Sequence, residues 1–338
     1  MIKLKIFSCL MLLLVMNISG FSYESPFHPP FTSSGRPYIL KDTPSSLFFS
    51  KETFGLALES AAGNYNFLHL FPWPAIEAYG RFRYKKFGGS IAIIDRYQFT
   101  TRDEMQFTSP LGEDLGKGYD WNYDLIYTLR TGLAYQILPN FVLGLSGDMN
   151  YGLKRYDLKV PAGTEDQFPG LVTHEQYTDY SGSFSVDGVI TSKTNYPILE
   201  VLYESKVRLN LDEIDYFVPA QVSIFLNLPL DVINVGVNYY RRFGQYRDSN
   251  DTLRTTVSND FALDCLTRVN ADTKLYSAFY TLSPNNYATS SKGIGISAGP
   301  CFAERYILRE VLLIYETGGA QGSNAKLTRY GLRIGFSL

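Results

Sequence analysis

The last twelve residues, Leu327 to Leu338, read L-T-R-Y-G-L-R-I-G-F-S-L. The even positions from Tyr330 onward are apolar or aromatic, whereas the odd positions between them are Arg, Gly or Ser. Because successive side chains of a strand point to opposite faces, this period of two predicts a β-strand with one apolar face. This strand alone does not show whether its apolar face packs against a protein core or contacts lipid, so the rest of the sequence is needed to distinguish the two.

The first 22 residues have the pattern of a secretory signal peptide. Two lysines precede an apolar run from Ile6 to Met16, and small residues follow that run. The run is too short to span a bilayer as a helix, so we expect residues 1–22 to be removed on export. Two cysteines then remain, Cys265 and Cys301, and we expect free thiols because the predicted strands place a whole strand between them.

The composition favours a large exported β protein. The 338 residues include 26 Tyr and 23 Phe, only 19% are charged, and no later apolar stretch is long enough for a spanning helix. The formal net charge of -2 gives no reason to expect a nucleic-acid partner. No stretch shows sustained apolar spacing of three and four residues, so we expect little helix.

After the signal peptide, residues 23–50 contain five prolines, which donate no ladder hydrogen bonds. We interpret this segment as either a flexible lead or a plug folded into a lumen. The remainder, 51–338, consists of alternating segments. They predict about fourteen strands, with twelve to sixteen open, at roughly 52–60, 75–85, 89–100, 121–136, 140–154, 176–190, 196–210, 216–228, 231–243, 255–268, 273–283, 292–302, 304–317 and 326–338.

The connections between these segments alternate between long polar loops and tight turns. The longest loops are expected at 101–120, 155–175 and 244–254, and short turns separate them, as at Leu138 to Asn140. Short turns on one side and long loops on the other are typical of outer-membrane barrels. An even strand number also closes the sheet, so no backbone groups are left unpaired in lipid. The sequence therefore predicts an all-β, antiparallel transmembrane barrel.

The C-terminal strand supports the same interpretation. An alternating apolar ending closed by Phe336 and a terminal hydrophobe resembles the targeting strand of bacterial outer-membrane barrels. This resemblance implies the outer membrane as the location, outer-membrane lipid as a surrounding partner, and the barrel-assembly machinery as the reader of that strand.

No motif in the chain indicates catalysis or a cofactor. The three histidines, His28, His69 and His174, have no metal-ligand spacing, and phosphate loops, nucleophile elbows and Cys-x-x-Cys are absent from the sequence. We therefore expect neither an enzyme, nor a metal site, nor a cofactor.

The polar faces of the predicted strands should line a lumen in which both charge signs mix. These side chains could pair across the lumen and fill it, or they could border an open channel. The lumen-facing candidates are Glu77, Arg81, Arg83, Asp124, Arg130, Asp148, Asp187, Glu200, Arg329 and Arg333.

Asp95 breaks the pattern of its strand. It shares parity with Ile91, Ile93, Tyr97 and Phe99, which points a carboxylate at lipid. A charged side chain on the lipid face is destabilising. A bulge, a kink that exposes the site to water, or a position near the interface would relieve this cost.

The first long loop is unusually apolar. It reads N-F-L-H-L-F-P-W-P from Asn66 and is either a patch for an apolar ligand or part of an aromatic girdle. Its candidate residues are Phe67, Leu68, Leu70, Phe71 and Trp73.

The hairpins at 130–152 (R-T-G-L-A-Y-Q-I-L-P-N-F-V-L-G-L-S-G-D-M-N-Y-G) and 226–240 (L-N-L-P-L-D-V-I-N-V-G-V-N-Y-Y) are similar to those of the FadL-like transporters of long-chain fatty acids and hydrophobic compounds. This resemblance implies a plug formed by the amino-terminal segment and a third-strand kink that opens the wall to lipid; Asp95 falls in the third predicted strand. The mature chain is shorter than typical members and lacks an Asn-Pro-Ala-like start.

The sequence thus favours an outer-membrane barrel that binds or passes small hydrophobic molecules. A porin-like channel for small hydrophilic solutes is the first alternative. A structural or adhesive barrel that acts through its long external loops is the second.

Overall fold

A computed structural model describes most of the chain. The described residues are 43–49, 53–65, 68–70, 75–109, 112, 114–163, 169–192, 197–211, 214–230, 232–247, 253–282, 290–303, 305–320 and 326–337. The predicted signal peptide and residues 23–42 of the extension lie outside these ranges.

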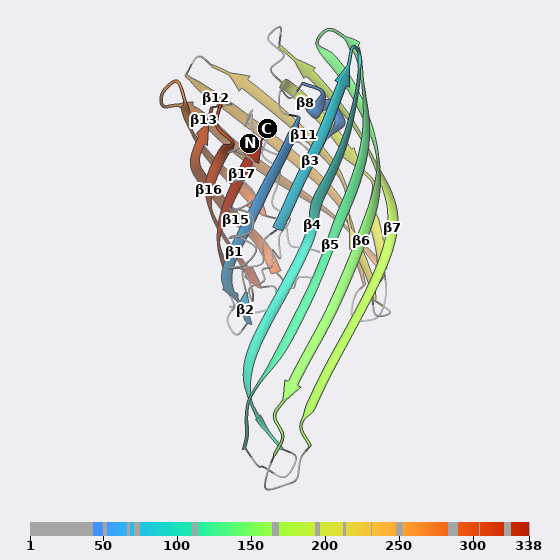
Figure 1. Cartoon of the computed structure of the whole chain (residues 1–338), viewed down its shortest axis with the longest axis vertical. Helices are drawn as coiled ribbons and strands as arrows, with labels where there is room; N and C mark the ends of the chain where they lie inside the picture. The colour runs from blue at the N-terminus through green and yellow to red at the C-terminus, as the bar shows by residue number, and fades with distance from the viewer. Residues whose placement is uncertain are drawn as a thin grey trace, which may run out of the picture.

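Fourteen strands form one closed antiparallel barrel, as the sequence predicted (Figure 1). They are β1 (Phe54–Tyr65), β3 (Ala75–Tyr84), β4 (Phe87–Thr108), β5 (Asp114–Leu138), β6 (Phe141–Val160), β7 (Leu171–Thr191), β8 (Pro197–Glu204), β11 (Ala220–Pro229), β12 (Ile233–Arg247), β13 (Leu253–Arg268), β14 (Thr273–Leu282), β15 (Ser290–Phe302), β16 (Leu308–Ala320) and β17 (Lys326–Ser337). The C-terminal strand β17 closes the barrel against β1, with Ser337 opposite Gly55.

Four short elements lie outside this count: α2 (Pro44–Phe49), β2 (Leu68–Leu70), β9 (Val207–Leu211) and β10 (Ile214–Val218). The predicted strands 196–210 and 216–228 contain the wall strands β8 and β11, but their facing ends are wrong. The wall strands β8 and β11 pair directly with each other, and β9 and β10 form a separate two-stranded hairpin between them. The alternation of side chains continues through this hairpin, so the pattern alone could not separate it from the wall.

The strands β4, β5, β6 and β7 are 20 to 25 residues long and extend well past the rest of the barrel (Figure 1). Much of the predicted loops 101–120 and 155–175 is therefore strand. The reason is continued pairing, since β4 pairs with β5 as far as Thr108 and β6 pairs with β7 as far as Val160. These stretches were predicted to be loops because they are rich in polar residues.

The two faces of the wall differ in composition. On β6 the exposed positions Leu143, Leu145 and Met149 alternate with the buried positions Ser146 and Asp148. The exposed apolar face points outward and the buried polar face lines the interior, as expected of a barrel in lipid. No helix among the described residues is long and apolar enough to cross a membrane.

Aromatic pairs lie near both limits of the apolar outer face. Phe87 and Tyr135 are in ring contact at 4.9 Å beside the tight turns, and Tyr151 and Tyr180 at 5.1 Å lie toward the long loops. Cys265 and Cys301 are both free thiols, on β13 and β15 with β14 between them.

Candidate functional site

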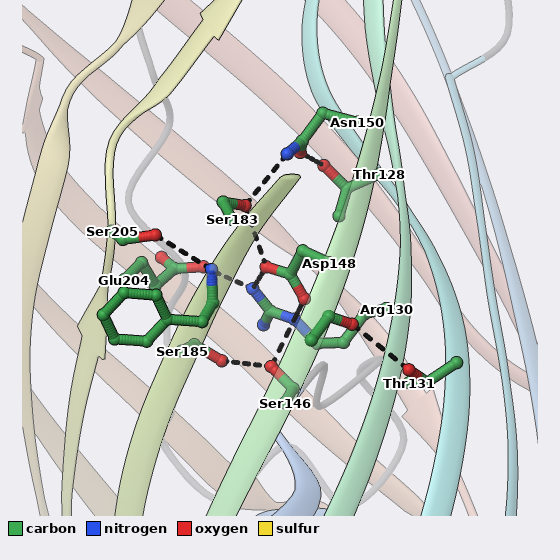
Figure 2. A network of polar contacts seen from close by, with 12 residues as sticks. Thr128, Arg130, Thr131, Ser146, Asp148, Asn150, Ser183, Ser185, Glu204 and Ser205 are labelled. Atoms are coloured by element: carbon green, nitrogen blue, oxygen red, sulfur yellow. Dashed lines mark hydrogen bonds and ion pairs between the residues drawn. The ribbon is translucent and has the colours of Figure 1, made fainter. Parts of the chain in front are cut away.

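A buried guanidinium lies at the centre of the interior wall on the β5–β7 side. The Arg130 side chain is fully buried and binds Asp148 through two hydrogen bonds of 2.8 Å. Its Nη2 also lies 2.9 Å from Glu204 on β8. One buried cation thus holds two buried carboxylates from neighbouring parts of the wall. Figure 2 shows this arrangement.

Hydroxyl and amide groups surround this charged cluster (Figure 2). Ser146 donates to Asp148 at 3.3 Å and also contacts Ser185, and Asn150 donates to Ser183 at 2.9 Å. Such a network satisfies the remaining lone pairs of the carboxylates, which buried charges require. Arg130 itself is already paired with two protein carboxylates, Asp148 and Glu204.

The short helix α2 is held against the same interior wall by two carboxylates. Thr43 donates its hydroxyl to Glu200 on β8 at 2.7 Å, and the Ser45 amide donates to Asp187 on β7 at 3.0 Å. The Ser45 hydroxyl also donates to Asp187. Two of the predicted lumen-facing acids therefore bind a segment that precedes the barrel in the chain.

The apolar side of α2 packs against the wall strands that follow. Leu47 is buried in a cluster with Ala57, Tyr79, Ala92 and Ile94. The Arg83 guanidinium lies 4.0 Å from the centre of the Phe48 ring. In Figure 1 the helix lies inside the ring of strands, at the end where the tight turns are.

The hairpin of β9 and β10 occupies another part of the interior. Val207, Leu209 and Leu211 are at most 2% exposed and pack against Ile126 of β5. The amide of Asn210 donates to Asp179 of β7 at 2.7 Å. This external connection is therefore folded against the inner surface of the wall.

A second polar network adjoins the first and was missed by the sequence reasoning, since Gln221 of β11 lies opposite both Glu204 of β8 and Arg242 of β12. Arg242 on β12 binds Asp260, and its Nε donates to Gln221 at 2.7 Å. Tyr280 donates to Glu316 at 3.0 Å. The signal was present, because Arg242 continues the polar parity of Asn238 on a strand whose other face is apolar.

The remaining lumen-facing candidates are distributed along the wall. Glu77 and Arg333 form an ion pair of 2.8 Å near the seam, where Arg333 also binds Glu310. Arg81 is half-buried on β3, and Arg83 is exposed. The side chains of Asp124 and Arg329 lie outside the described part of the structure, although both residues belong to strands.

The described ladder on one side of β4 has a gap. The ladder between β3 and β4 ends at Ala78 opposite Ile93 and resumes only at Leu70 of β2 opposite Thr101, in the same register. Positions 94–96 of β4, which this register would set opposite Glu77, Ile76 and Ala75, have no partner among the described residues on that side; positions 97–100 would oppose residues 71–74, outside the described ranges. The segment between β2 and β3 reads F-P-W-P at 71–74, and its two prolines lack the amide donors that a ladder needs.

A β-bulge in β4 lies in the same stretch. Asp95 opposes Tyr127 of β5, whereas Tyr97 opposes Ile126, so one residue between them is unpaired. This shift corrects the expectation that positions 91 to 99 share one face, because directly opposed residues lie on the same side of a sheet and Ile126 is an inner position. The side chain of Asp95 itself lies outside the described part.

The apolar loop candidates are only partly covered by the structure. Leu68 and Leu70 belong to β2 by their backbone, and their side chains are not among those described. Phe67, Phe71 and Trp73 lie outside the described residues altogether. His174, on β7, bonds Asp157, and no cluster of three or more His, Cys, Asp or Glu suited to a metal occurs in the described ranges.

Solved structures with the same architecture include a hydrocarbon channel and a toluene transporter. The CymD monoaromatic hydrocarbon channel matches with a TM-score of 0.59 at 11% identity, over 95% of this chain and 98% of that one. The barrel shares the fold of FadL-family channels. The toluene transporter TbuX of Ralstonia pickettii matches with a TM-score of 0.57 at 12% identity, over 95% and 99% of the two chains. A FadL homologue of Pseudomonas aeruginosa gives 0.55 at 10% identity, over 94% and 99%.

No protein-family model and no curated protein matches the sequence. The resemblance to FadL-like hairpins is thus confirmed by the fold and not by sequence similarity. Of the neighbours named above, CymD is described as a channel and TbuX as a transporter.

Proposed function

We propose that this chain is an integral barrel of the bacterial outer membrane that passes small hydrophobic molecules through its interrupted wall. The observation that carries the proposal is that β4 lacks ladder partners at positions 94–96 among the described residues, beside the β-bulge at Asp95. A closed wall would confine a solute to the lumen, whereas a break at strand level offers an apolar molecule a lateral route into lipid. Asp95, beside the bulge, is the residue that we place at this opening.

The interior supports the lateral route over a straight aqueous pore. The helix α2 is bonded to Asp187 and Glu200, and the hairpin of β9 and β10 packs on the inner wall near Ile126. A general porin keeps a hydrated lumen for hydrophilic solutes. Here two separate segments occupy the interior. The structural neighbours named for toluene and monoaromatic hydrocarbons agree with this proposal.

The test is to restore the missing ladder donors. Pro72→Val with Pro74→Val supplies two amide donors and two strand-favouring side chains in the segment of sequence between β2 and β3. We expect the uptake of radiolabelled toluene by cells that express this variant to fall to the level of cells without the protein. Pro169→Val, in the loop between β6 and β7, is the matched control and should leave uptake unchanged.

The alternatives predict different results. A porin-like channel would show steady ion conductance in planar bilayers whether or not the two prolines are present, and it would give no toluene uptake. Equal toluene uptake by the wild type and by the Pro72→Val, Pro74→Val variant would refute the lateral route. An Asp95→Leu variant with normal uptake would remove Asp95 from the proposal while leaving the opening in place.

A further inference from the structure

An arginine of β12 lies on the outer face of the barrel. Arg241 is exposed and stands between two buried inner residues, Tyr240 and Arg242. The outer positions that precede it on the same strand include Ile233 and Val237, both exposed and apolar. A charged side chain on the lipid face is destabilising near the middle of the bilayer, and the cost falls toward the interfaces.

The position of Arg241 along its strand places it near the external edge of the apolar band. β12 begins at Ile233, beside the tight turn in which the Leu230 amide donates to the Ile233 carbonyl. From Ile233 to Arg241, a strand tilted by about 40° rises roughly 20 Å, and the apolar band of such barrels is about 25 Å tall. The ring pair of Tyr239 and Phe261, 5.2 Å apart, lies just below Arg241, as expected of an interfacial girdle.

The described outer positions that surround the Arg241 side chain contain no carboxylate. They are Val222 of β11, Asn259 of β13, and Tyr239 and Phe243 of β12. The Cζ atom of Arg241 lies 5.5 Å from the centre of the Phe243 ring, and this contact orients the guanidinium. Asp260 of β13 faces the interior instead, where it binds Arg242. The charge of Arg241 is therefore directed to an anion outside the barrel.

Asn259 places a second donor beside the guanidinium. The Tyr239 hydroxyl donates to Oδ1 of Asn259 at 2.7 Å, so the oxygen of this side chain is engaged and its Nδ2 group remains as a donor. Asn259 is exposed and lies directly opposite Arg241, and such residues have Cβ atoms about 5 Å apart. The Nδ2 group and the guanidinium are close enough to donate to one anion.

We propose that Arg241 and Asn259 bind the phosphate of a lipid headgroup in the external leaflet, and that the occupant is a phosphorylated glycolipid of the lipid A class. The leaflet follows from the long loops, which mark the external side of a barrel. A guanidinium donates to two phosphate oxygens at once. A phosphate monoester offers three acceptor oxygens and nearly two negative charges, which suits two neighbouring donors better than the phosphodiester of a phospholipid.

The apolar surface below the site fits the rest of such a lipid. Ile224 and Val237 are 38% and 42% exposed on the outer faces of β11 and β12. Acyl chains attached to a headgroup at Arg241 extend along these side chains. The site lies outside the lumen and on β12 and β13, so it adds to the proposed function and does not depend on it.

The experiment measures lipid bound to the detergent-purified full chain by native mass spectrometry. The probe is bisphosphorylated lipid A, and lipid A without its phosphates is the matched control lipid. We expect the wild type to bind the phosphorylated form about tenfold more tightly, the effect of roughly 1.4 kcal/mol from charge-assisted hydrogen bonds. Equal binding of the two forms would overturn the proposal.

Three variants test the assigned residues. Asn259→Asp keeps the acceptor of the Tyr239 hydroxyl but sets a carboxylate opposite Arg241, so it should abolish the preference for phosphorylated lipid A. Arg241→Gln should do the same. Arg155→Gln is the control, because that arginine also lies on the outer face but already pairs with Asp157 at 2.9 Å, and it should behave as the wild type. A wild-type preference in the first two variants would refute the site.

Further measurements separate the outcomes. The SDS gel mobility of the unheated protein shows whether each variant is folded, and the comparison of the two lipids on the wild type tests the site without any variant. Tighter binding of phosphatidylglycerol than of lipid A would overturn the assigned glycolipid. Toluene uptake by Arg241→Gln cells should equal that of the wild type, so failure of the lipid site and failure of the lateral route are distinguishable.

Discussion

Replacing Arg130 with methionine is expected to lower the free energy of unfolding by about 3–5 kcal/mol, because it leaves buried carboxylates without their cation. Asp148 and Glu204 are 7% and 5% exposed, so water cannot substitute for the guanidinium. Urea unfolding in phospholipid vesicles, followed by tryptophan fluorescence, would measure the loss. The SDS gel mobility of the unheated protein would show whether the variant still folds.

Two controls make this result specific. Arg155→Met removes an arginine whose side chain is 37% exposed and which pairs with Asp157 at 2.9 Å, so the expected cost is about 0–1 kcal/mol. A triple replacement, Arg130→Met with Asp148→Leu and Glu204→Leu, should recover most of the stability, since apolar substitutes for a buried ion cluster are often neutral. If Arg130→Met costs no more than Arg155→Met, the buried cluster does not stabilise the barrel.

Removing the carboxylates that hold α2 should open the lumen. Asp187→Leu with Glu200→Leu deletes the acceptors of the Thr43 and Ser45 hydrogen bonds. Hydrogen bonds to charged groups contribute about 1.5–3 kcal/mol each, so losing all three shifts the docking equilibrium of the helix by roughly 1,000-fold or more. We expect single-channel conductance in planar bilayers to rise from a closed level to a stable open level.

The matched control is Glu316→Leu, which removes another buried inner-wall carboxylate, bonded to Tyr280 and not to α2. It should leave the conductance at the wild-type level. Tryptic cleavage at Lys41 and Lys51, which flank the helix in sequence, should accelerate in the Asp187→Leu, Glu200→Leu variant only. Conductance that rises equally in both variants would mean that α2 does not close the lumen.

The sequence predicted the barrel because its two strongest signals are local. Alternation in β17 and in β5 requires only that neighbouring side chains point to opposite faces, and the alternating loop lengths require only the chain order. The sequence reasoning failed where two different structures produce the same local pattern. The stretch 207–211 alternates like a wall strand, yet it pairs only with β10, and the bulge between Asp95 and Tyr97 reverses a parity that the sequence shows as continuous.

The sequence predicted which charged residues face the interior, but it did not predict which residues they bind. Parity along each strand was enough to nominate Arg130, Asp148, Asp187 and Glu200 for the interior. Their hydrogen-bond partners could not be predicted from parity, because they are far apart in the sequence: Glu204 is 74 residues from Arg130, and Thr43 is 157 residues from Glu200. Thr43 and Ser45 also belong to a Pro-rich segment in which no periodic pattern indicated a helix.

The sequence by itself determined the fold class and which face of most strands is apolar, because these follow from alternation along a single strand; it predicted about fourteen strands with twelve to sixteen open. The tertiary structure decided which charges neutralise one another, that α2 and the hairpin of β9 and β10 occupy the interior, and where the ladder beside β4 stops. These features depend on barrel closure, which fixes the register of every strand and brings distant segments within hydrogen-bond distance. No property of a single strand encodes that register.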